Sequence, residues 1–436
     1  MTEVTFAVRG NIGTLTPSER SLLCDRGLTT SSGVRDTVAA ILSRVRSGGD
    51  AALRELAHEL DGVTLESLEV PRDRWSAALD SLDRDTLRAL ERARDNIACA
   101  HAAWMPATVE VETEPGVVIG RRADPLSRVG VYAPGGRAVY PSSVLMGVVP
   151  AHVAGVGEVV VCSPPQADGW PAPAVLAAAA LGDAGRVFSL GGAGAVAAMA
   201  FGTESVPRVD RIVGPGNAYV AEAKAQVAAV VGIDSPAGPS ELLVVWDGSA
   251  NAATIAREML AQAEHDPDAA VVLLLLPGAS REVLEIELGA QLASAPRAGI
   301  ARQAFAGRGA MLQAETSVEA LSFAEAWAPE HLLLAVEDPE AMLPLVRNAG
   351  TVFLGENASV AFGDYLTGAN HVLPTSGTAR SYSGLSTIDF MRWTTYQRVS
   401  RAAASAMAAA TATLADIEGL PAHASAARAW QMKEVQ

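Results

Sequence analysis

The chain has few cysteines, and their spacing does not suggest a bridge or a metal ribbon. Cys24, Cys99 and Cys162 are the only three in 436 residues, and they lie far apart. So sparse and odd a set argues against a disulfide framework and indicates a reducing compartment. The first residues do not have the layout of a signal peptide, and apolar runs such as residues 269–277 are too short to span a bilayer. We therefore expect a soluble, cytoplasmic protein.

Basic residues are also scarce relative to acidic ones. The sequence has 33 Lys and Arg against 49 Asp and Glu, for a net charge of −16. This balance argues against nucleic acid or an anionic membrane as partner, and it favours a small polar or charged metabolite. The length allows two or three domains, and 49% hydrophobic residues can bury large cores.

The first hundred residues and the rest of the chain differ in their hydrophobic pattern. Residues 1–30 show no strong periodicity and are expected to form a small N-terminal segment, while helical spacing follows up to residue 104. From about Gly116, short β-rich runs alternate with alanine-rich helical runs. The expected strands are residues 117–120, 129–133, 158–162, 186–190, 211–213, 242–246, 269–276, 331–336 and 351–355. This alternation predicts parallel, doubly wound α/β architecture. Beyond Asp389 the chain is expected to turn helical and alanine-rich, over residues 401–415, and to form a C-terminal arm.

Glycine-rich turns follow several of the expected strands, where ligands of parallel sheets bind. They are Pro134-Gly135-Gly136, Gly191-Gly192-Ala193-Gly194 and Gly214-Pro215-Gly216-Asn217, and Asn217 can cap the next helix. Backbone N–H groups at a helix start can hold a phosphate. Tight turns need glycine for a positive φ even without a ligand, but two such turns in one sheet favour a nucleotide.

Only seven histidines occur, and four of them lie beyond position 260 in polar surroundings. Gln262 and His265 end a helical run and are three residues apart, so they share one face. An enzymatic zinc site takes about four nitrogen and oxygen ligands. The residues that could form such a shell are Gln262, His265, Asp364 and His423. Those left for proton transfer and substrate contacts are Glu330, His331, His371 and Glu418. Each residue alone is more often an ordinary structural one.

Nine motifs, in order from about residue 130 to the C-terminus, resemble the histidinol dehydrogenase family. They are Tyr132-Ala-Pro-Gly-Gly-Arg-Ala-Val-Tyr-Pro-Ser-Ser, Val213-Gly-Pro-Gly-Asn-Ala-Tyr-Val, Ala237-Gly-Pro-Ser-Glu, Gln262-Ala-Glu-His, Ala328-Pro-Glu-His, Gly363-Asp-Tyr, Asn370-His-Val-Leu-Pro-Thr, Ser383-Gly-Leu-Ser and Glu418-Gly-Leu-Pro-Ala-His. None is specific alone, but together they are highly specific.

The resemblance implies an enzyme with one zinc ion per subunit that oxidises L-histidinol to L-histidine, through the aldehyde, in two NAD-dependent steps. It implies two Rossmann-like domains, one inserted in the other. The expected divisions are an N-terminal segment (1–26), a first domain (27–130 and 243–385) with the metal and catalytic residues, a second domain (131–242) for the cofactor, and a C-terminal dimerisation arm (386–436). In the implied homodimer this arm reaches the partner's site, so Glu418 and His423 would act in trans.

The resemblance also implies a role for each site residue. Zinc would be bound by Gln262, His265, Asp364 and His423. Glu330 and His331 would be the acid–base pair. The substrate would contact these four zinc ligands, His331, Ser240, His371 and Glu418. The cofactor would be bound near Tyr132, Gly194 and Asn217. Gly194 departs from the family, which usually has glutamine there, and we expect weaker NAD binding as a result.

Four other readings remain open. Gly194 leaves room for a paralogue that has the same zinc site and oxidises another small amino alcohol. A zinc hydrolase would use Glu330 to activate water, but four protein ligands leave little open coordination. A thiol-dependent aldehyde dehydrogenase would need Cys162 as nucleophile, and we expect this cysteine to be buried packing. A non-catalytic binding protein would need neither the acid–base pair nor the metal shell.

Overall fold

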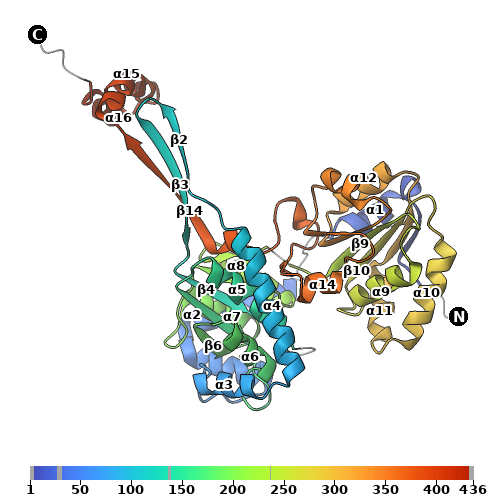
Figure 1. The fold of residues 1–436 in the computed structure, drawn as a ribbon. Helices are drawn as coiled ribbons and strands as arrows, with labels where there is room; N and C mark the ends of the chain where they lie inside the picture. The colour runs from blue at the N-terminus through green and yellow to red at the C-terminus, as the bar shows by residue number, and fades with distance from the viewer. Residues whose placement is uncertain (1–3, 27–31, 136–138, 236, 432–436) are drawn as a thin grey trace, which may run out of the picture. The chain divides into compact units, whose positions relative to one another are not determined.

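The computed structural model describes residues 4–26, 32–135, 139–235 and 237–431 (Figure 1). Gly136 of the first glycine turn and residues 27–31 of the expected first domain lie outside this part. Contacts divide the chain into a first unit (Met1–Trp104 and Leu126–Phe390) and a second unit (Met105–Pro125 and Met391–Gln436). Within the described part of the chain, no helix combines the length and apolar character that crossing a bilayer requires.

The larger sheet of the first unit is parallel, as the sequence predicts. Among the described residues its strands, in order across the sheet, are β1 (Val8–Asn11), β11 (Ala310–Gln313), β10 (Ala270–Leu275), β9 (Glu241–Trp246), β12 (His331–Ala335) and β13 (Thr351–Leu354). Its helices are α1 (Pro17–Cys24), α9 (Ala252–Ala263), α10 (Arg281–Ser294), α11 (Ala298–Arg308), α12 (Ser317–Trp327), α13 (Pro339–Met342) and α14 (Val360–Tyr365).

Both faces of this sheet are covered, as near-continuous apolar strands require. Leu242 and Val244 of β9 pack in one buried cluster with residues of α9, α10 and α11. Their neighbours Leu243 and Val245 pack in another, with residues of α1 and α12. Successive side chains of a strand point to opposite faces, so β9 is buried on both sides.

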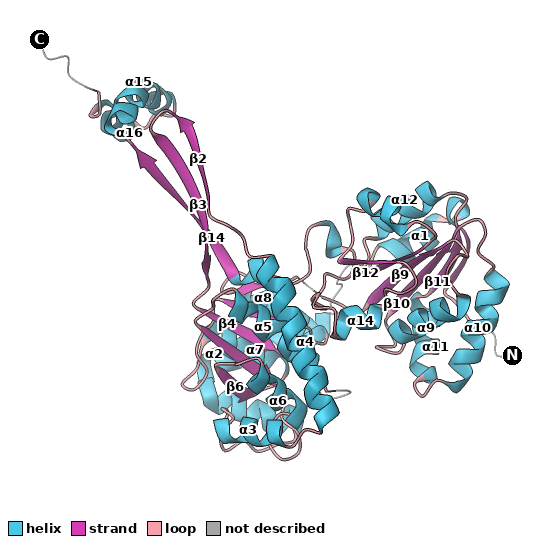
Figure 2. Cartoon of the chain, viewed as in Figure 1, coloured by secondary structure: helices cyan, strands magenta, loops and turns pink. Residues whose placement is uncertain are grey.

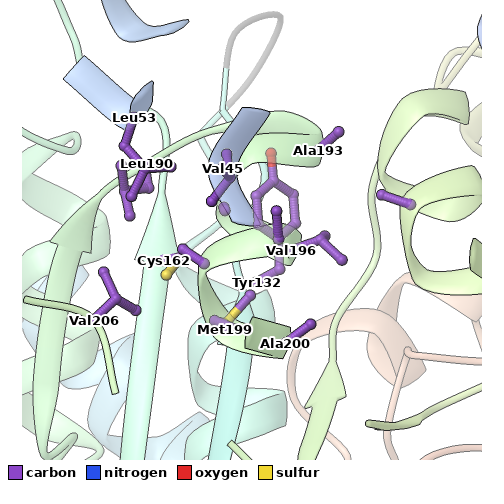
Figure 3. Close-up of a cluster of buried hydrophobic side chains, with 14 of the residues drawn as sticks. Val45, Leu53, Tyr132, Cys162, Leu190, Ala193, Val196, Met199, Ala200 and Val206 are labelled. Atoms are coloured by element: carbon purple, nitrogen blue, oxygen red, sulfur yellow. The ribbon is translucent and has the colours of Figure 1, made fainter. Parts of the chain in front are cut away.

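The smaller sheet of the first unit is also parallel. Among the described residues its strands, in order, are β6 (Arg186–Ser189), β5 (Glu158–Ser163), β4 (Arg128–Tyr132), β7 (Arg211–Val213) and β8 (Gly232–Ile233). The helices around it are α2 (Ser32–Leu56), α3 (Arg72–Asp80), α4 (Arg84–Ala103), α5 (Pro141–Val153), α6 (Pro173–Leu181), α7 (Gly192–Phe201) and α8 (Ala218–Val227). Figure 3 shows the core on one face, where Tyr132 and Cys162 lie among side chains of α2 and α7. Cys162 is therefore buried packing, as expected.

The described packing groups two segments differently from the expected divisions. Helix α2 contacts α7 and α8, helix α3 contacts α6, and helix α4 contacts α5, so all three pack beside the smaller sheet. Residues 27–130 were instead expected to belong with residues 243–385. Strand β1 lies in the expected N-terminal segment and pairs with β11 of the larger sheet. Both segments are locally ambiguous, because helical spacing and a four-residue strand do not specify which sheet they join.

In the described residues, the second unit consists of a three-stranded antiparallel sheet and two helices (Figure 2). Its elements are β2 (Val109–Glu114), β3 (Val117–Pro125), β14 (Met391–Val399), α15 (Arg401–Ile417) and α16 (Pro421–Arg428). Strand β3 therefore does not belong to the parallel alternation in which it was expected. The helix expected over residues 401–415 is confirmed as α15. Strand β14, which precedes it and pairs with β3, was not expected. The Trp, Thr, Tyr and Val content of β14 favours a strand.

Candidate active site

Glu330 and His331 lie at the start of β12, buried inside the larger sheet. Helix α12 ends at Trp327, and the next residue, Ala328, has a left-handed φ of 51° that turns the chain into Pro329 and the strand. The parallel register then places His331 beside Leu242 of β9. His331 is only 3% exposed and Glu330 is 5% exposed, so each must find polar partners within the fold.

The two ring nitrogens of His331 face different groups. Nδ1 lies 2.9 Å from the backbone oxygen of Glu241 and 3.4 Å from Oε2 of Glu330. Nε2 lies 3.5 Å from Oδ1 of Asp364, and among the described residues it has no hydrogen-bond partner. A carbonyl oxygen can only accept, so Nδ1 carries a proton. Burial lowers the pKa of His331, but the carboxylates of Glu330 and Asp364 outweigh burial and raise it well above its usual range.

Asp364 is presented by the short helix α14. Gly363 precedes it, and a Cβ there would lie 2.7 Å from the Phe353 ring, so only glycine lets α14 approach β13 this closely. Burial raises the pKa of the Asp364 carboxyl, but the nearby rings of His331, His371 and His265 outweigh it, and the pKa is lowered overall. The predicted ligands Asp364 and His265 are thus within electrostatic reach of each other.

His371 lies on the loop after α14 and borders the same small hollow as His331. Its Nδ1 donates to the backbone oxygen of Asp364 over 2.8 Å, so its Nε2 accepts the hydroxyl of Ser143 over 3.2 Å. The residues that line this hollow are His331, Thr351, Phe353, Gly363, Asp364, Ala369, Asn370, His371 and Leu373.

Gln262 has a buried amide group whose polar atoms are unpaired within the described part of the chain. It lies in the last turn of α9 and is only 1% exposed, yet among the described residues neither its amide oxygen nor its amide nitrogen has a hydrogen-bond partner. An unpaired buried amide is costly, and a bound cation would satisfy the oxygen. His265 follows one turn later, is exposed, and donates its backbone N–H to the backbone oxygen of Gln262 over 3.3 Å. In the described residues, no three His, Cys, Asp or Glu side chains gather closely enough to hold a metal ion.

The glycine turns follow β6 and β7 of the smaller sheet, at the carboxyl ends of its strands. The Tyr132 hydroxyl accepts the N–H of Gly192, which opens α7, over 3.1 Å. Burial raises the pKa of Tyr132 to about 12, so the hydroxyl keeps its proton. Gly214 has a φ of +117°, and a Cβ there would lie 2.1 Å from the Tyr132 backbone oxygen. Asn217 caps α8 by accepting the N–H groups of Tyr219 and Val220, as predicted.

The remaining candidates are Glu418, His423, Ser240 and Gly194. Glu418 and His423 are exposed residues of the second unit. Ser240 lies in the first unit, one residue before β9. Gly194 is buried within α7.

Sequence reasoning assigned no role to three residues that the structure connects to the site. Ser143 bonds to His371, Glu241 bonds to both Glu330 and His331, and Arg26 pairs with Glu241. One signal was present: Glu241 is the only charged residue in the strand ELLVVW, and buried charges need partners.

Comparison with known proteins identifies the family. The family model described as histidinol dehydrogenase matches residues 24–430. The chain is 46% identical over 413 residues to histidinol dehydrogenase from Methanosarcina mazei, covering 94% of this chain and 95% of the relative. It is 47% identical over 400 residues to that from Xanthomonas euvesicatoria pv. vesicatoria, covering 91% and 93%. The crystal structure of histidinol dehydrogenase from Elizabethkingia anophelis aligns with a TM-score of 0.92 at 33% identity, over 99% of this chain and 98% of that one. The chain therefore belongs to the histidinol dehydrogenase family and is an oxidoreductase.

Proposed function

We propose that this chain oxidises L-histidinol to L-histidine through the aldehyde in two hydride transfers to NAD, with one zinc ion per subunit. The observation that carries the proposal is the buried His331 ring, held between Glu330 and Asp364 at a small hollow. Oxidising an alcohol requires removal of the hydroxyl proton as the hydride departs, and imidazole suits that task near neutral pH.

His331 would act through Nε2. Because Nδ1 donates to the Glu241 backbone, Nε2 carries the lone pair of the neutral ring, and it lies on the side of Asp364, which also borders the hollow. The carboxylates beside it raise the pKa of His331, which would favour the charged ring. A cation at Asp364 would neutralise one of these carboxylates and lower that pKa, returning the ring to its basic form. Glu330, one residue away, would remove a proton from the water that attacks the aldehyde in the second oxidation.

The residues that would hold the zinc are Gln262, His265 and Asp364, together with His423 from a second copy of the chain. Their nitrogen and oxygen donors suit zinc, and the unpaired Gln262 amide fits a ligand role. When bound, the cation would hold the imidazole and amine of histidinol and so orient the carbinol. Ser240, His371 and Glu418 would contact the rest of the substrate.

The cofactor would lie at the carboxyl ends of the smaller sheet, near Tyr132, Gly194 and Asn217. Of the amides at the start of α7, that of Gly192 is already bonded to Tyr132, so the turn after β7 and the α8 cap are the more available phosphate contacts. Gly194 offers no side-chain contact to NAD. We further propose a homodimer in the cytoplasm. The three free cysteines support a reducing setting.

The test is NADH formation from L-histidinol before chelation, after chelation and after zinc is restored. We expect activity that disappears with the metal and returns with zinc. A panel of other amino alcohols should react poorly. Faster turnover of another amino alcohol would favour the paralogue, to which Gly194 points, and hydrolysis without NAD would support a zinc hydrolase instead.

A further inference from the structure

Glu241 is a buried acidic residue that connects the proposed acid–base pair to the rest of the larger sheet. It opens β9, is only 2% exposed, and is followed by five apolar residues. A carboxylate in such a place needs nearly complete pairing. Its Oε1 accepts Nε of Arg26 over 2.8 Å and the backbone N–H of Ser376 over 2.8 Å, while Oε2 accepts Nη2 of Arg26 over 3.0 Å.

The backbone of this same residue contacts both members of the pair. The Glu241 N–H donates to Oε2 of Glu330 over 2.7 Å. Its carbonyl oxygen accepts Nδ1 of His331 over 2.9 Å. A displacement of the start of β9 would therefore move a hydrogen-bond partner of both Glu330 and His331. It would also break the bond that keeps the proton on Nδ1 of His331 and leaves Nε2 as the basic nitrogen.

Arg26 binds both the Glu241 side chain and backbone oxygens of two helices. Besides its two bonds to Glu241, it donates from Nη2 to the backbone oxygen of Trp327 over 2.8 Å and from Nη1 to that of Leu23 over 3.1 Å. Its guanidinium also lies 3.6 Å from the Trp327 ring centroid. Trp327 ends α12, three residues before Glu330. One planar, rigid group thus fixes both the start of β9 and the turn that delivers Glu330 and His331.

We propose that Arg26 and Glu241 are positioning residues that hold Glu330 and His331 in their working geometry and tautomer. The inference rests on the acid–base roles proposed above. Neither residue touches the hollow, and both act through the backbone of Glu241 and the end of α12. The charge balance agrees with this role: burial raises the pKa of the Glu241 carboxyl, and Arg26 opposes the rise. Without Arg26, an uncompensated carboxyl would lie beside Glu330.

The primary test is Arg26→Met, which keeps the length of the side chain and removes the charge and the donors. We expect kcat for histidinol to fall roughly 10- to 100-fold, because small misplacements of catalytic groups have effects of that size. KM for histidinol and for NAD should stay within about twofold, since no proposed binding residue changes. Arg26→Lys keeps the positive charge but lacks the planar guanidinium that binds both carboxylate oxygens, and it should recover part of kcat. Glu241→Gln keeps an acceptor for Ser376 and should resemble Arg26→Met.

A matched control separates positioning from general damage to the fold. Asp50 is another buried carboxylate, bonded to the Thr203 hydroxyl over 2.6 Å and the Ser205 N–H over 3.2 Å, and its partners lie beside the smaller sheet. Asp50→Asn should lower the melting temperature but leave kcat near the wild-type value. Folded Arg26→Lys or Glu241→Gln with wild-type kcat would overturn the inference, even if Arg26→Met does not fold.

A readout independent of turnover keeps the two proposals distinguishable. At a pH high enough for the His331 ring to be neutral, nitrogen-15 NMR of the histidine rings should find the proton on Nδ1 in the wild-type protein and a mixture of tautomers in Arg26→Lys. No NADH from histidinol with the wild-type protein would refute the proposed function. An unchanged His331 tautomer in Arg26→Lys would refute the positioning role whatever the substrate proves to be.

Discussion

At the scale of single residues, the site depends on groups whose proximity no sequence pattern could establish. His331 and Asp364 stand 33 positions apart in sequence and approach within 3.5 Å. Glu330, His331 and Asp364 were all selected from the sequence, because acids beside histidines in polar loops are unusual. Arg26 was not selected, because it lies in a stretch without periodicity and its partner Glu241 is 215 positions away.

His331→Asn and Glu330→Gln should separate the two oxidations. The first variant loses the group that takes the alcohol proton, so we expect histidinol oxidation to fall roughly 10²- to 10⁴-fold and aldehyde oxidation to fall less. The second should mainly impair aldehyde oxidation, since it loses the base for water. The two oxidation rates are measured separately, as NADH formation with histidinol or with histidinal as the substrate. His58→Asn, the same change at an exposed histidine, is the control. Equal, small losses at both steps would contradict the assigned roles.

His101 provides a prediction for stability against pH. It is fully buried in α4, and among the described residues neither ring nitrogen has a hydrogen-bond partner. Burial lowers its pKa to about 4, below the usual value of about 6.5. Between these values the unfolded chain binds a proton that the folded chain does not, so stability falls as the pH drops. From pH 8 to pH 5 this amounts to about 2 kcal/mol.

The check is the free energy of unfolding by urea, measured at both pH values and one protein concentration. The His101→Leu variant should lack this loss, so its stability relative to the wild-type protein should rise by about 2 kcal/mol on acidification. A constant difference between His101→Leu and wild type at the two pH values would refute the explanation.

At the scale of elements, the sequence predicted most buried strands well. The expected strand 211–213 coincides with β7, and the expected 158–162 differs from β5 by one residue. These strands are bounded by glycine, proline or polar residues, which gives them clear limits. Strands β1 and β14 were missed. The first is only four residues long, and the second is largely exposed, so neither has a strong hydrophobic pattern.

Gly194 makes a prediction for α7. A Cβ at this position would lie 3.6 Å from side-chain atoms of Leu53 and Leu56 on α2, which is ordinary contact, so the fold does not require glycine here. Gly194→Gln should lower KM for NAD roughly 2- to 10-fold, the effect of one hydrogen bond. Gly194→Ala is the control, because it adds the Cβ and helix propensity without the amide. No gain of Gln over Ala would count against a cofactor contact at this position.

At the scale of the whole molecule, the proposed homodimer can be tested by mixing inactive subunits. If His423 serves the partner's site, a mixed dimer of His331→Asn and His423→Ala chains has one site with both defects and one with neither. Mixing the two variants after reversible dissociation should then restore about a quarter of wild-type activity, because half the dimers are mixed and each has one intact site. Activity that stays at the level of the separate variants would argue against a shared site.

The arrangement of helices around the two parallel sheets was only partly predictable from the sequence. The two parallel sheets were foreseeable, since apolar strands alternate with helices and parallel strands need such crossovers. The allocation of α2, α3 and α4 to the smaller sheet was not, because amphipathic spacing shows that a helix packs but not on which surface.

The pairing of β3 with β14 has a consequence for how the chain is made. These strands lie about 270 residues apart in sequence, so at a translation rate of about 5–20 residues per second β3 leaves the ribosome roughly 13–50 s before its partner. Throughout that interval one edge of the β2–β3 hairpin is open to other nascent chains. Strand β3 has Arg121 and Arg122 near its middle, and charge of this kind discourages edge-to-edge association while the polypeptide waits for completion.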